Sequence, residues 1–344
     1  MTNKIIPTTE VDVQNLVKYF DVSAPWLSRV FSGQPKQILK AVDGISFKIQ
    51  KGETFSLVGE SGCGKSTIAR LLVGLYEPTD GKIKIKGHDI SNLDSPKALR
   101  TLRKNVQMIF QDPFASLNPR WHVKDIIAEP IRAHKTLSDN HAIDKRVNEL
   151  LDLVSLTKVD GDKFPHEFSG GQRQRISIAR ALASKPEFIV CDEPTSALDV
   201  SVQAQILNLM VDLQKELGLT YLFISHNLAV VYHISDHVGV MYLGRLAEVR
   251  DSKSLFSNPL HPYTRLLLDT IPDLDMSGRD RMPVAGEVPN PIDPPKACRF
   301  HPRCPFANER CKTEMPLPTP VPGGYVECHG VQENRLPAYV PIVR

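Results

Sequence analysis

The stretch "FSLVGESGCGKSTIARLLVGL", residues 55–75, joins a short apolar run to a glycine-rich turn and then to a helical pattern. Within it, Gly59–Ser66 fits G-x-x-x-x-G-K-[ST] in the strand–loop–helix context that a phosphate-binding loop requires. The glycines let backbone N–H groups curl around phosphate oxygens, and the start of the helix adds positive potential. This stretch predicts an α/β core that binds a nucleotide through a phosphate loop.

The phosphate loop assigns expected roles to its own residues. Lys65 is expected to reach the β- and γ-phosphates, and the Ser66 hydroxyl is expected to ligate Mg²⁺. The alternative is a chance glycine-rich turn, which the flanking strand and helix disfavour. The residues expected around the nucleotide are Gly59, Ser61, Gly62, Cys63, Gly64, Lys65, Ser66 and Thr67.

A second motif, "EFIVCDEP" at residues 187–194, is an apolar strand that ends in two acids. Asp192 is placed to hold Mg²⁺, directly or through water. Glu193 is placed beside the γ-phosphate, where it can orient or deprotonate the attacking water. Two acids at a strand end are common by themselves, and the upstream phosphate loop is what gives them this interpretation.

Three further side chains fit the same chemistry. Gln111 follows an apolar strand and is a candidate contact of Mg²⁺ and the attacking water, and His226 ends the strand "LFISH" beside the γ-phosphate. Phe20, or its neighbour Tyr19, is a candidate to stack on adenine. Each also has an ordinary interpretation, as a loop glutamine, a strand-end histidine or a core aromatic, and only the whole constellation favours the chemical one.

Strand and helix patterns alternate along the chain, which indicates a mostly parallel sheet with an antiparallel edge, wrapped by helices. We expect an ATPase domain over residues 1–256, with a helical subdomain at about 112–183. After residue 257 the chain becomes proline-rich, as in "NPIDPP", so we expect a separate small C-terminal extension with little regular structure over 257–344.

Composition limits the class of protein. The net charge of +3 over 344 residues gives no argument for a nucleic-acid partner. No apolar run approaches the roughly 20 residues that span a bilayer. The opening "MTNKIIPTTE" has no apolar core of a secretory signal, so none is expected.

The motifs together resemble the ATPase subunits of ATP-binding-cassette (ABC) transporters. The resemblance runs from about Val11 to Val249, and the family usually has Leu where this chain has Phe168, a position that is apolar either way. In chain order the matching motifs are the phosphate loop, Gln111, the signature "FSGGQ" (Phe168–Gln172), Asp192–Glu193, "SALD" (Ser196–Asp199) and His226.

The resemblance implies that two ATPase subunits pack head to tail. The signature of one subunit then covers the γ-phosphate that the other subunit's phosphate loop holds, and Asp199 lies across the seam between them. A helix start without lysine is a weak anion site alone, so closure depends on ATP and hydrolysis reopens the pair. The family thereby adds Ser169, Gly170, Gly171, Gln172 and Asp199 to the nucleotide-binding residues.

Longer stretches are similar to the oligopeptide/dipeptide (Opp/Dpp) importers, and to their second, F-type ATPase subunit. These stretches are "FQDPFASLNPR" (110–120), "EPTSALDVSVQAQILNLM" (193–210) and "NPLHPYTRLLL" (258–268). The resemblance implies peptide uptake from the cytoplasmic face of the inner membrane, with nickel, opine or sugar as alternative cargo. It also implies as partners a D-type ATPase subunit, two transmembrane permease subunits and an extracytoplasmic substrate-binding protein, and no nucleic acid.

The permease subunits are expected to contact the segment after Gln111, "DPFASLNPRW", where Phe114 and Trp121 suit an interface. Ordinary packing within the helical subdomain is the alternative.

Four of the six cysteines, Cys298, Cys304, Cys311 and Cys328, follow the spacing C-x5-C-x6-C-x16-C in the C-terminal extension. Four thiolates match the ligand count of a [4Fe–4S] cluster or of structural zinc. The resemblance favours the cluster, since some members of the subfamily are thought to hold one in a similar tail. The spacing lacks the paired C-x-x-C knuckles of zinc ribbons, His301 and His329 are competing ligands, and disulfides or free thiols are the remaining alternative.

Two other classes of function compete with an importer ATPase. A soluble ABC protein acting on nucleic acid or ribosomes usually carries a long coiled coil, a zinc-hook insertion or two cassettes, and the sequence shows none of these. A phosphate-loop kinase, a GTPase or a nucleotide sensor does not account for the Ser-Gly-Gly-Gln helix and Glu193 together. The sequence therefore predicts an ATP-hydrolysing enzyme.

Overall fold

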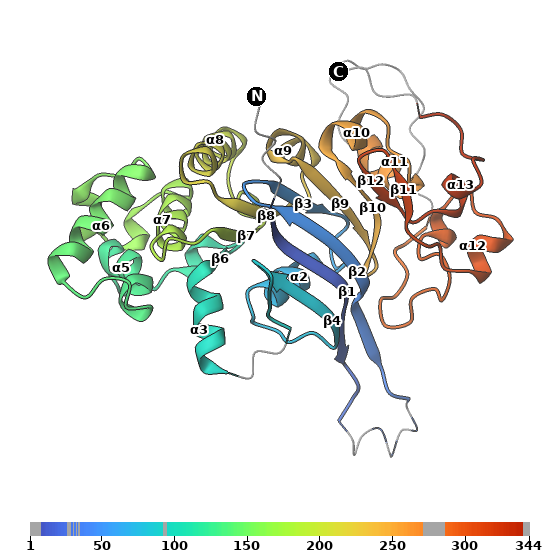
Figure 1. Cartoon of the computed structure of the whole chain (residues 1–344), viewed down its shortest axis with the longest axis horizontal. Coiled ribbons are helices and arrows are strands. Elements are labelled where there is room, and N and C mark those ends of the chain that lie inside the picture. Colours follow the sequence, from blue (N-terminus) through green and yellow to red (C-terminus); the bar gives the residue numbers. More distant parts are fainter. Residues whose placement is uncertain are drawn as a thin grey trace.

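A computed structural model describes residues 8–25, 29, 31, 33, 35–91, 95–270 and 286–339. Its strands form one eight-stranded sheet and one four-stranded sheet, with helices around them (Figure 1). The strands are β1 (Thr9–Asp21), β2 (Ile38–Gln50), β3 (Thr54–Val58), β4 (Asp80–Ile85), β5 (His88–Asp89), β6 (Val106–Ile109), β7 (Phe188–Asp192), β8 (Thr220–Ile224), β9 (His237–Tyr242), β10 (Arg245–Asp251), β11 (Thr319–Val321) and β12 (Gly324–Val326). The helices are α2 (Lys65–Leu72), α3 (Pro96–Asn105), α4 (Pro113–Ser116), α5 (Val123–Ala133), α6 (Asn140–Leu153), α7 (Gly170–Leu182), α8 (Val200–Leu217), α9 (Leu228–Ile234), α10 (Ser252–Ser257), α11 (Pro262–Asp269), α12 (Glu309–Thr313) and α13 (His329–Gln332), with 3-10 turns η1 (Lys158–Asp162), η2 (Pro165–Glu167) and η3 (His301–Arg303).

The eight-stranded sheet has the order β11-β12-β10-β9-β3-β8-β7-β6. The strands from β9 to β6 pair in parallel, while β10, β12 and β11 continue the sheet with antiparallel pairing. Every residue of β3, β7 and β8 is buried, because helices cover one face of the parallel part and α2 with the four-stranded sheet covers the other. The prediction of a mostly parallel sheet with an antiparallel edge is confirmed.

The four-stranded sheet has the order β2-β1-β4-β5 and is antiparallel. Residues of α2, including Ile68 and Leu72, share one hydrophobic core with strands of both sheets. In this core the rings of Phe47 and Phe55 stack with centroids 4.9 Å apart, one from β2 and one from β3. The helix that follows the phosphate loop is therefore fixed on both sides.

The helical subdomain and the C-terminal segment lie at opposite ends of the molecule (Figure 1). Helices α5, α6 and α7 share a second hydrophobic core, and Phe168 is 5% exposed within it. The N-terminus of α6 is capped by Asp139, whose carboxylate accepts from the Ala142 N–H at 2.9 Å. The same core includes residues of β7 and α8, so the subdomain is anchored to the sheet that carries the acids.

The C-terminal segment is not detached from the core, which departs from the expectation of a separate unit. Strand β12 pairs with β10 in the register Glu248↔Val326, so the β11–β12 hairpin extends the main sheet. A third hydrophobic core contains Tyr242 from β9 together with Tyr263 and Phe300, which lie after residue 257. The predicted boundaries at residues 112, 183 and 256 stay predictions.

Candidate functional site

A cavity of about 280 Å³ opens where β3 ends and the phosphate loop begins. Its lining comes from the phosphate loop, from β1 and β2, from the turn after β9 and from the ends of β6 and β7. The lining residues are Phe20, Leu39, Lys40, Ala41, Ser61, Gly62, Gly64, Lys65, Ser66, Thr67, Gln111, Glu193, Leu243, Gly244 and Pro291. Most of the residues predicted around the nucleotide thus meet at one place.

Two glycines of the phosphate loop have no room for a side chain. Gly59 has φ +149°, and a Cβ there would lie 2.1 Å from the Met241 carbonyl oxygen. Gly64 has φ +111°, and a Cβ there would lie 2.1 Å from the Ala41 carbonyl oxygen. Among the described residues no side chain caps α2 at Gly64, so the start of this helix is available to an anion.

Lys65 lines the cavity, and backbone carbonyls of the phosphate loop hold its ammonium. Its Nζ donates to the carbonyl oxygens of Gly59 at 2.8 Å and Glu60 at 3.0 Å. A triphosphate carries full negative charge and is a stronger partner for an ammonium than two carbonyls. Cys63 is different from its neighbours, because its side chain is 4% exposed and packs in the core rather than lining the cavity.

Ser66 and Asp192 form an oxygen pair that suits Mg²⁺. The Ser66 hydroxyl donates to Oδ1 of Asp192 at 3.1 Å. Burial raises the pKa of Asp192, the hydrogen bond from Ser66 lowers it, and the charge of Glu193 raises it again. A divalent cation relieves such crowding of carboxylates, and hydroxyl and carboxylate oxygens are the ligands that Mg²⁺ prefers. The residues therefore fit a bound Mg²⁺.

Glu193 contacts the other two predicted catalytic residues. Its Oε2 accepts from Nε2 of Gln111 at 3.0 Å and lies 3.2 Å from Nδ1 of His226. Glu193 has φ +48°, a left-handed conformation that costs of order 1 kcal/mol outside glycine and turns the chain sharply after β7. The structure brings Gln111, Glu193 and His226 together, although His226 is not among the lining residues. Their catalytic roles stay predictions.

The two aromatic candidates for the adenine are separated by the structure. Phe20 lines the cavity and meets Tyr76 edge to face, with ring centroids 5.4 Å apart. Tyr19 instead donates its hydroxyl to Asp43, and burial followed by that bond raises the pKa of Tyr19 to about 12. The geometry favours Phe20, and its contact with adenine stays a prediction.

The signature residues lie apart from the cavity of their own chain. Ser169 caps α7 by accepting from the Gln172 N–H at 3.3 Å, while Gln172 Oε1 accepts from the Ser169 N–H at 3.0 Å. Gly171 has no space for a Cβ, which would lie 2.4 Å from Cγ1 of Val202. Ser169, Gly170, Gln172 and Asp199 are exposed, and no signature residue is among those lining the nucleotide cavity.

The four cysteines of the C-terminal segment line one small cavity together with His301 and His329. None of the four is in a disulfide. Burial raises the pKa of Cys298 to about 12 and that of Cys304 to about 11. Across the described ranges, no three His, Cys, Asp or Glu side chains converge in the way that a single metal ion requires.

The sequence interpretation missed a set of contacts between this C-terminal segment and the phosphate loop. Arg303 pairs with Glu60, the Tyr263 hydroxyl accepts from the Glu60 N–H, and Pro291 lines the nucleotide cavity. No local sequence pattern predicts these contacts, because the two residues of each hydrogen-bonded pair lie more than two hundred positions apart in the chain.

Within the described ranges, no helix combines the length and the apolar character needed to cross a membrane.

Comparisons with known proteins match both halves of the chain. A family model described as "ABC transporter" matches residues 42–196, and one described as "Oligopeptide/dipeptide transporter, C-terminal region" matches residues 247–311. The chain is 51% identical to the oligopeptide transport ATP-binding protein AppF of Bacillus subtilis, over 93% of this chain and 97% of that protein. It is 49% identical to the dipeptide transport ATP-binding protein DppF of Haemophilus influenzae, over 92% of this chain and 95% of that protein.

Solved structures are similar over the ATPase core. An ATP-binding cassette determined as a dimer in a post-hydrolysis state, bound to ADP and Pi, superposes with a TM-score of 0.61 at 26% identity. The similarity covers 70% of this chain and 98% of that one.

Proposed function

The chain belongs to the family of ABC transporter ATP-binding proteins, in its oligopeptide/dipeptide branch, and from this premise we propose that it powers peptide uptake. As a member of this family it is an ATPase. The observation that carries the choice of peptides is the extent of the similarity. It continues through the C-terminal segment, at residues 247–311, and is not confined to the nucleotide motifs that all ABC ATPases share.

The nucleotide chemistry is assigned to the cavity residues. Lys65 and the start of α2 hold the phosphates of ATP, and Phe20 stacks on its adenine. Ser66 and Asp192, with Gln111, hold Mg²⁺, which neutralises charge on the phosphates when it is bound. Glu193 orients or deprotonates the attacking water, and His226 contacts the γ-phosphate.

The exposed signature is assigned to a neighbouring subunit's nucleotide. Two subunits pack head to tail, so that Ser169 and Gly171 at the start of α7 meet the γ-phosphate in the partner's phosphate loop, and Asp199 lies at the seam. Support comes from exposure, since Ser169, Gly170 and Asp199 are exposed and no signature residue lines the nucleotide cavity of its own chain. ATP then closes the pair and hydrolysis releases it.

The assembly that we propose contains a D-type ATPase subunit, two transmembrane permease subunits and an extracytoplasmic binding protein, and no nucleic acid. The chain lies peripherally on the cytoplasmic face of the inner membrane. The permease contact is the segment after Gln111, where Phe114 is 51% and Trp121 is 44% exposed. Apolar rings at this exposure suit an interface, and the guanidinium of Arg173 lies 5.0 Å from the Phe114 ring centroid at its border.

Residues 1–256 form the ATPase domain in this proposal, with the helical subdomain at about 112–183, and residues 257–344 form the extension. Within the extension we assign a [4Fe–4S] cluster to the four cysteines. Support is limited to the number and kind of donors, because four thiols line one cavity, while among the described residues no three of them converge as a metal site requires. The space between them is about 10 Å³, so the thiols must turn apart to admit a cluster.

Zinc is the second choice for this site, and hydrogen bonds disfavour the two histidines as its ligands. Both ring nitrogens of His329 are engaged, with Glu314 and Gln332, and Nδ1 of His301 contacts the Cys298 carbonyl. Protein purified without air is expected to be brown and to contain about four iron atoms per chain. If protein purified without air is colourless and contains one zinc per chain, the site holds zinc and not a cluster.

Uptake measurements test the choice of cargo. In cells whose chromosomal copy carries Glu193→Gln, uptake of a labelled dipeptide or tetrapeptide is expected to fall at least about tenfold. Uptake of labelled nickel, opine and sugar in the same cells is the internal comparison. Loss of one of these with normal peptide uptake would assign that cargo instead.

Co-purification tests the membrane partners. If no integral membrane proteins co-purify with the wild-type protein from detergent-solubilised membranes, it is not an importer subunit.

A further inference from the structure

Glu60 is the second residue of the phosphate loop, and its side chain leaves the nucleotide cavity for the C-terminal segment. Both of its carboxylate oxygens accept from Arg303, at 2.7 Å and 2.9 Å. The Arg303 side chain is 3% exposed and that of Glu60 is 27% exposed. A bidentate, largely buried pair of this kind is geometrically strict, and removing one partner leaves the other charge without compensation.

The backbone of Glu60 is held as well. Its N–H donates to the hydroxyl of Tyr263 in α11 at 2.9 Å, and Tyr263 is fully buried. Its carbonyl accepts from Nζ of Lys65 at 3.0 Å. Residue 60 is thus fixed at three points, two of which belong to the C-terminal segment and the third to the lysine expected to bind phosphate.

The support behind Arg303 is a rigid aromatic cluster. The Tyr242 and Tyr263 ring centroids lie 4.6 Å apart, and Phe300 meets Tyr242 edge to face at 5.3 Å. The guanidinium of Arg303 lies 5.8 Å from the Tyr242 ring centroid and 5.9 Å from that of Phe300. Cation–π contacts of this kind fix where the guanidinium points, and therefore where the Glu60 carboxylate rests.

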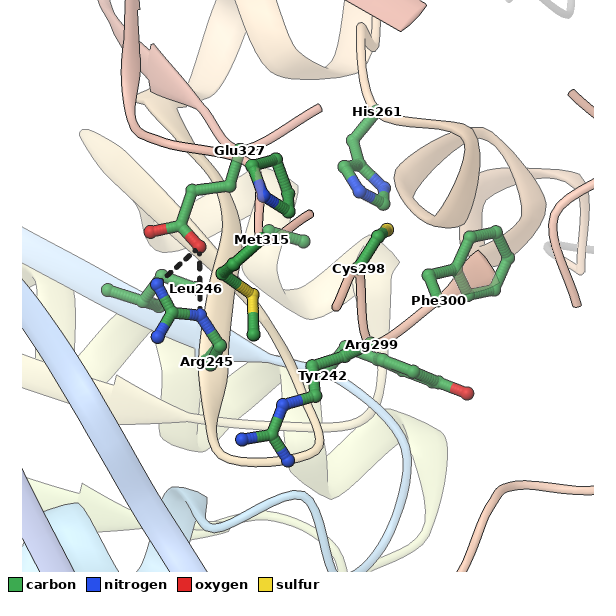
Figure 2. A pocket seen from close by; sticks show the side chains of 11 residues that line it. Tyr242, Arg245, Leu246, His261, Cys298, Arg299, Phe300, Met315 and Glu327 are labelled. Carbon is green, nitrogen blue, oxygen red and sulfur yellow. Dashed lines mark hydrogen bonds and ion pairs between the residues drawn. The ribbon is translucent and has the colours of Figure 1, made fainter. Parts of the chain in front are cut away.

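A second arginine on the same stretch, Arg299, forms a buried ion pair with a residue of the ATPase core through one contact only. Figure 2 shows Cys298, Arg299 and Phe300 around a pocket of about 20 Å³, with the ion pair of Arg245 and Glu327 facing them. Arg299 is buried and pairs with Asp43. Asp43 follows closely on Lys40 and Ala41, which line the nucleotide cavity. The stretch that begins at Cys298 therefore contacts Glu60 and Asp43, two residues that lie close in sequence to residues lining the nucleotide cavity.

We propose that Arg303 is a positioning residue for ATP. It fixes Glu60 and with it the backbone at the start of the phosphate loop, from a position 243 residues downstream. This inference rests on the proposed role of the loop in binding ATP, and it gives the C-terminal segment a part in nucleotide affinity. Neither Glu60 nor Arg303 lines the nucleotide cavity, so their effect must pass through the loop.

The test is direct binding of ATP with Mg²⁺ to the full chain, followed by steady-state hydrolysis in the assembly. Arg303→Met is expected to raise the Kd and the KM for ATP about tenfold, with kcat at saturating ATP within about twofold. Arg303→Lys is expected to recover only part of the affinity, because an ammonium cannot form the two-point contact. Glu60→Gln is a second variant that weakens the same pair from the loop side.

The double variant Glu60→Gln/Arg303→Met distinguishes positioning from general loss of stability. If the pair acts as proposed, the double variant binds ATP no more weakly than the poorer single variant, because the two effects are not additive. Arg310→Met is the matched control. Arg310 lies in the same segment but makes exposed ion pairs with Glu314 and Glu333, so ATP affinity is expected to stay unchanged.

Two results would overturn the inference. One is an Arg303→Met chain with a lower Tm and an unchanged Kd for ATP, which would make the pair purely structural. The other is strict additivity in the double variant. Failure of the wild-type chain to bind ATP at all would be a different result, since it removes the proposed role of the phosphate loop itself and this inference with it.

Discussion

Helices α2 and α7 both begin at glycine-rich turns, yet the two starts are built in opposite ways. At α2, Gly64 leaves the helix without a side-chain cap, and Lys65 and Asp192 stand beside it. At α7, Ser169 and Gln172 cap one another, and the turn lies exposed. The start of α2 has no side-chain cap, lies beside charged side chains and lines a cavity of its own chain. The start of α7 has capped backbone N–H groups, an uncharged Ser-Gly-Gly-Gln turn and an exposed Ser169.

The difference teaches that a helix start alone does not make a nucleotide site. A site needs an enclosing cavity and counter-charges, and the nucleotide cavity is lined by residues at the start of α2 and, among the described residues, by none at the start of α7. The start of α7 is stable without a ligand, because its capping box satisfies two backbone N–H groups. It is therefore stable while exposed to solvent, as the proposed contact with a partner's nucleotide requires. Each prediction below would break or sharpen this contrast.

The largest effect is expected at the acid beside the first helix start. Glu193→Gln keeps the hydrogen-bonding shape of the side chain but removes its basicity, so turnover is expected to fall at least about 100-fold while ATP still binds. Steady-state ATPase rates and ATP binding in the intact assembly measure this. Glu187→Gln, which alters a partly exposed acid paired with Lys86, is the control and is expected to leave turnover unchanged. Unchanged turnover in Glu193→Gln would mean that the base is misassigned.

The next effect separates the two helix starts directly. Lys65→Ala is expected to weaken ATP binding to the isolated chain at least about tenfold, because a charge-assisted contact is lost. Ser169→Ala is expected to leave that binding unchanged and to lower turnover of the assembly about tenfold, since one partner of the remote γ-phosphate is removed. Binding titrations on the isolated chain and ATPase rates of the assembly measure the pair.

A cap has its own stability cost, so Ser169→Ala needs a matched variant. Asp139→Ala removes the cap of α6 in the same subdomain and is expected to cost about 1 kcal/mol of unfolding free energy, as Ser169→Ala does. Only Ser169→Ala should lower turnover. Equal turnover in the two cap variants would reduce Ser169 to a structural cap.

The smallest effect concerns the wall of the cavity. Phe20→Ala is expected to raise the KM for ATP about threefold, because stacking on one aromatic ring contributes about 1 kcal/mol or less. The KM for ATP in steady-state hydrolysis measures it. Tyr19→Phe, which keeps the ring and removes the hydroxyl that faces Asp43, is expected to leave the KM unchanged. A Phe20→Ala protein with the wild-type KM would remove Phe20 from the site.

The sequence predicts the nucleotide cavity well because its signals are local. The glycines, Lys65 and Ser66 lie within eight residues, and the acids end a strand whose apolar run is visible in the chain. Parallel pairing then brings the ends of β3, β7 and β8 to one edge of the sheet, and with them Asp192 and His226. The fold and the convergence of these residues therefore follow from the sequence motifs and from the hydrophobic periodicity of the strands and helices.

The C-terminal segment could not be predicted in the same way. Its proline-rich composition indicates little regular structure but says nothing of where it docks. The β11–β12 hairpin joins β10 by backbone pairing, which three-residue strands do not announce. The contact between Arg303 and Glu60 depends on tertiary packing of distant residues, and a single arginine carries no pattern.

The central claim is that the start of α7 serves a nucleotide held by another subunit. Cryo-electron microscopy of the Glu193→Gln assembly with ATP and Mg²⁺ tests it most directly. We predict that the Ser169 hydroxyl and the Gly171 N–H lie about 3 Å from γ-phosphate oxygens in the partner's phosphate loop. A closed, ATP-loaded assembly in which Ser169 faces solvent, away from any triphosphate, would contradict the account.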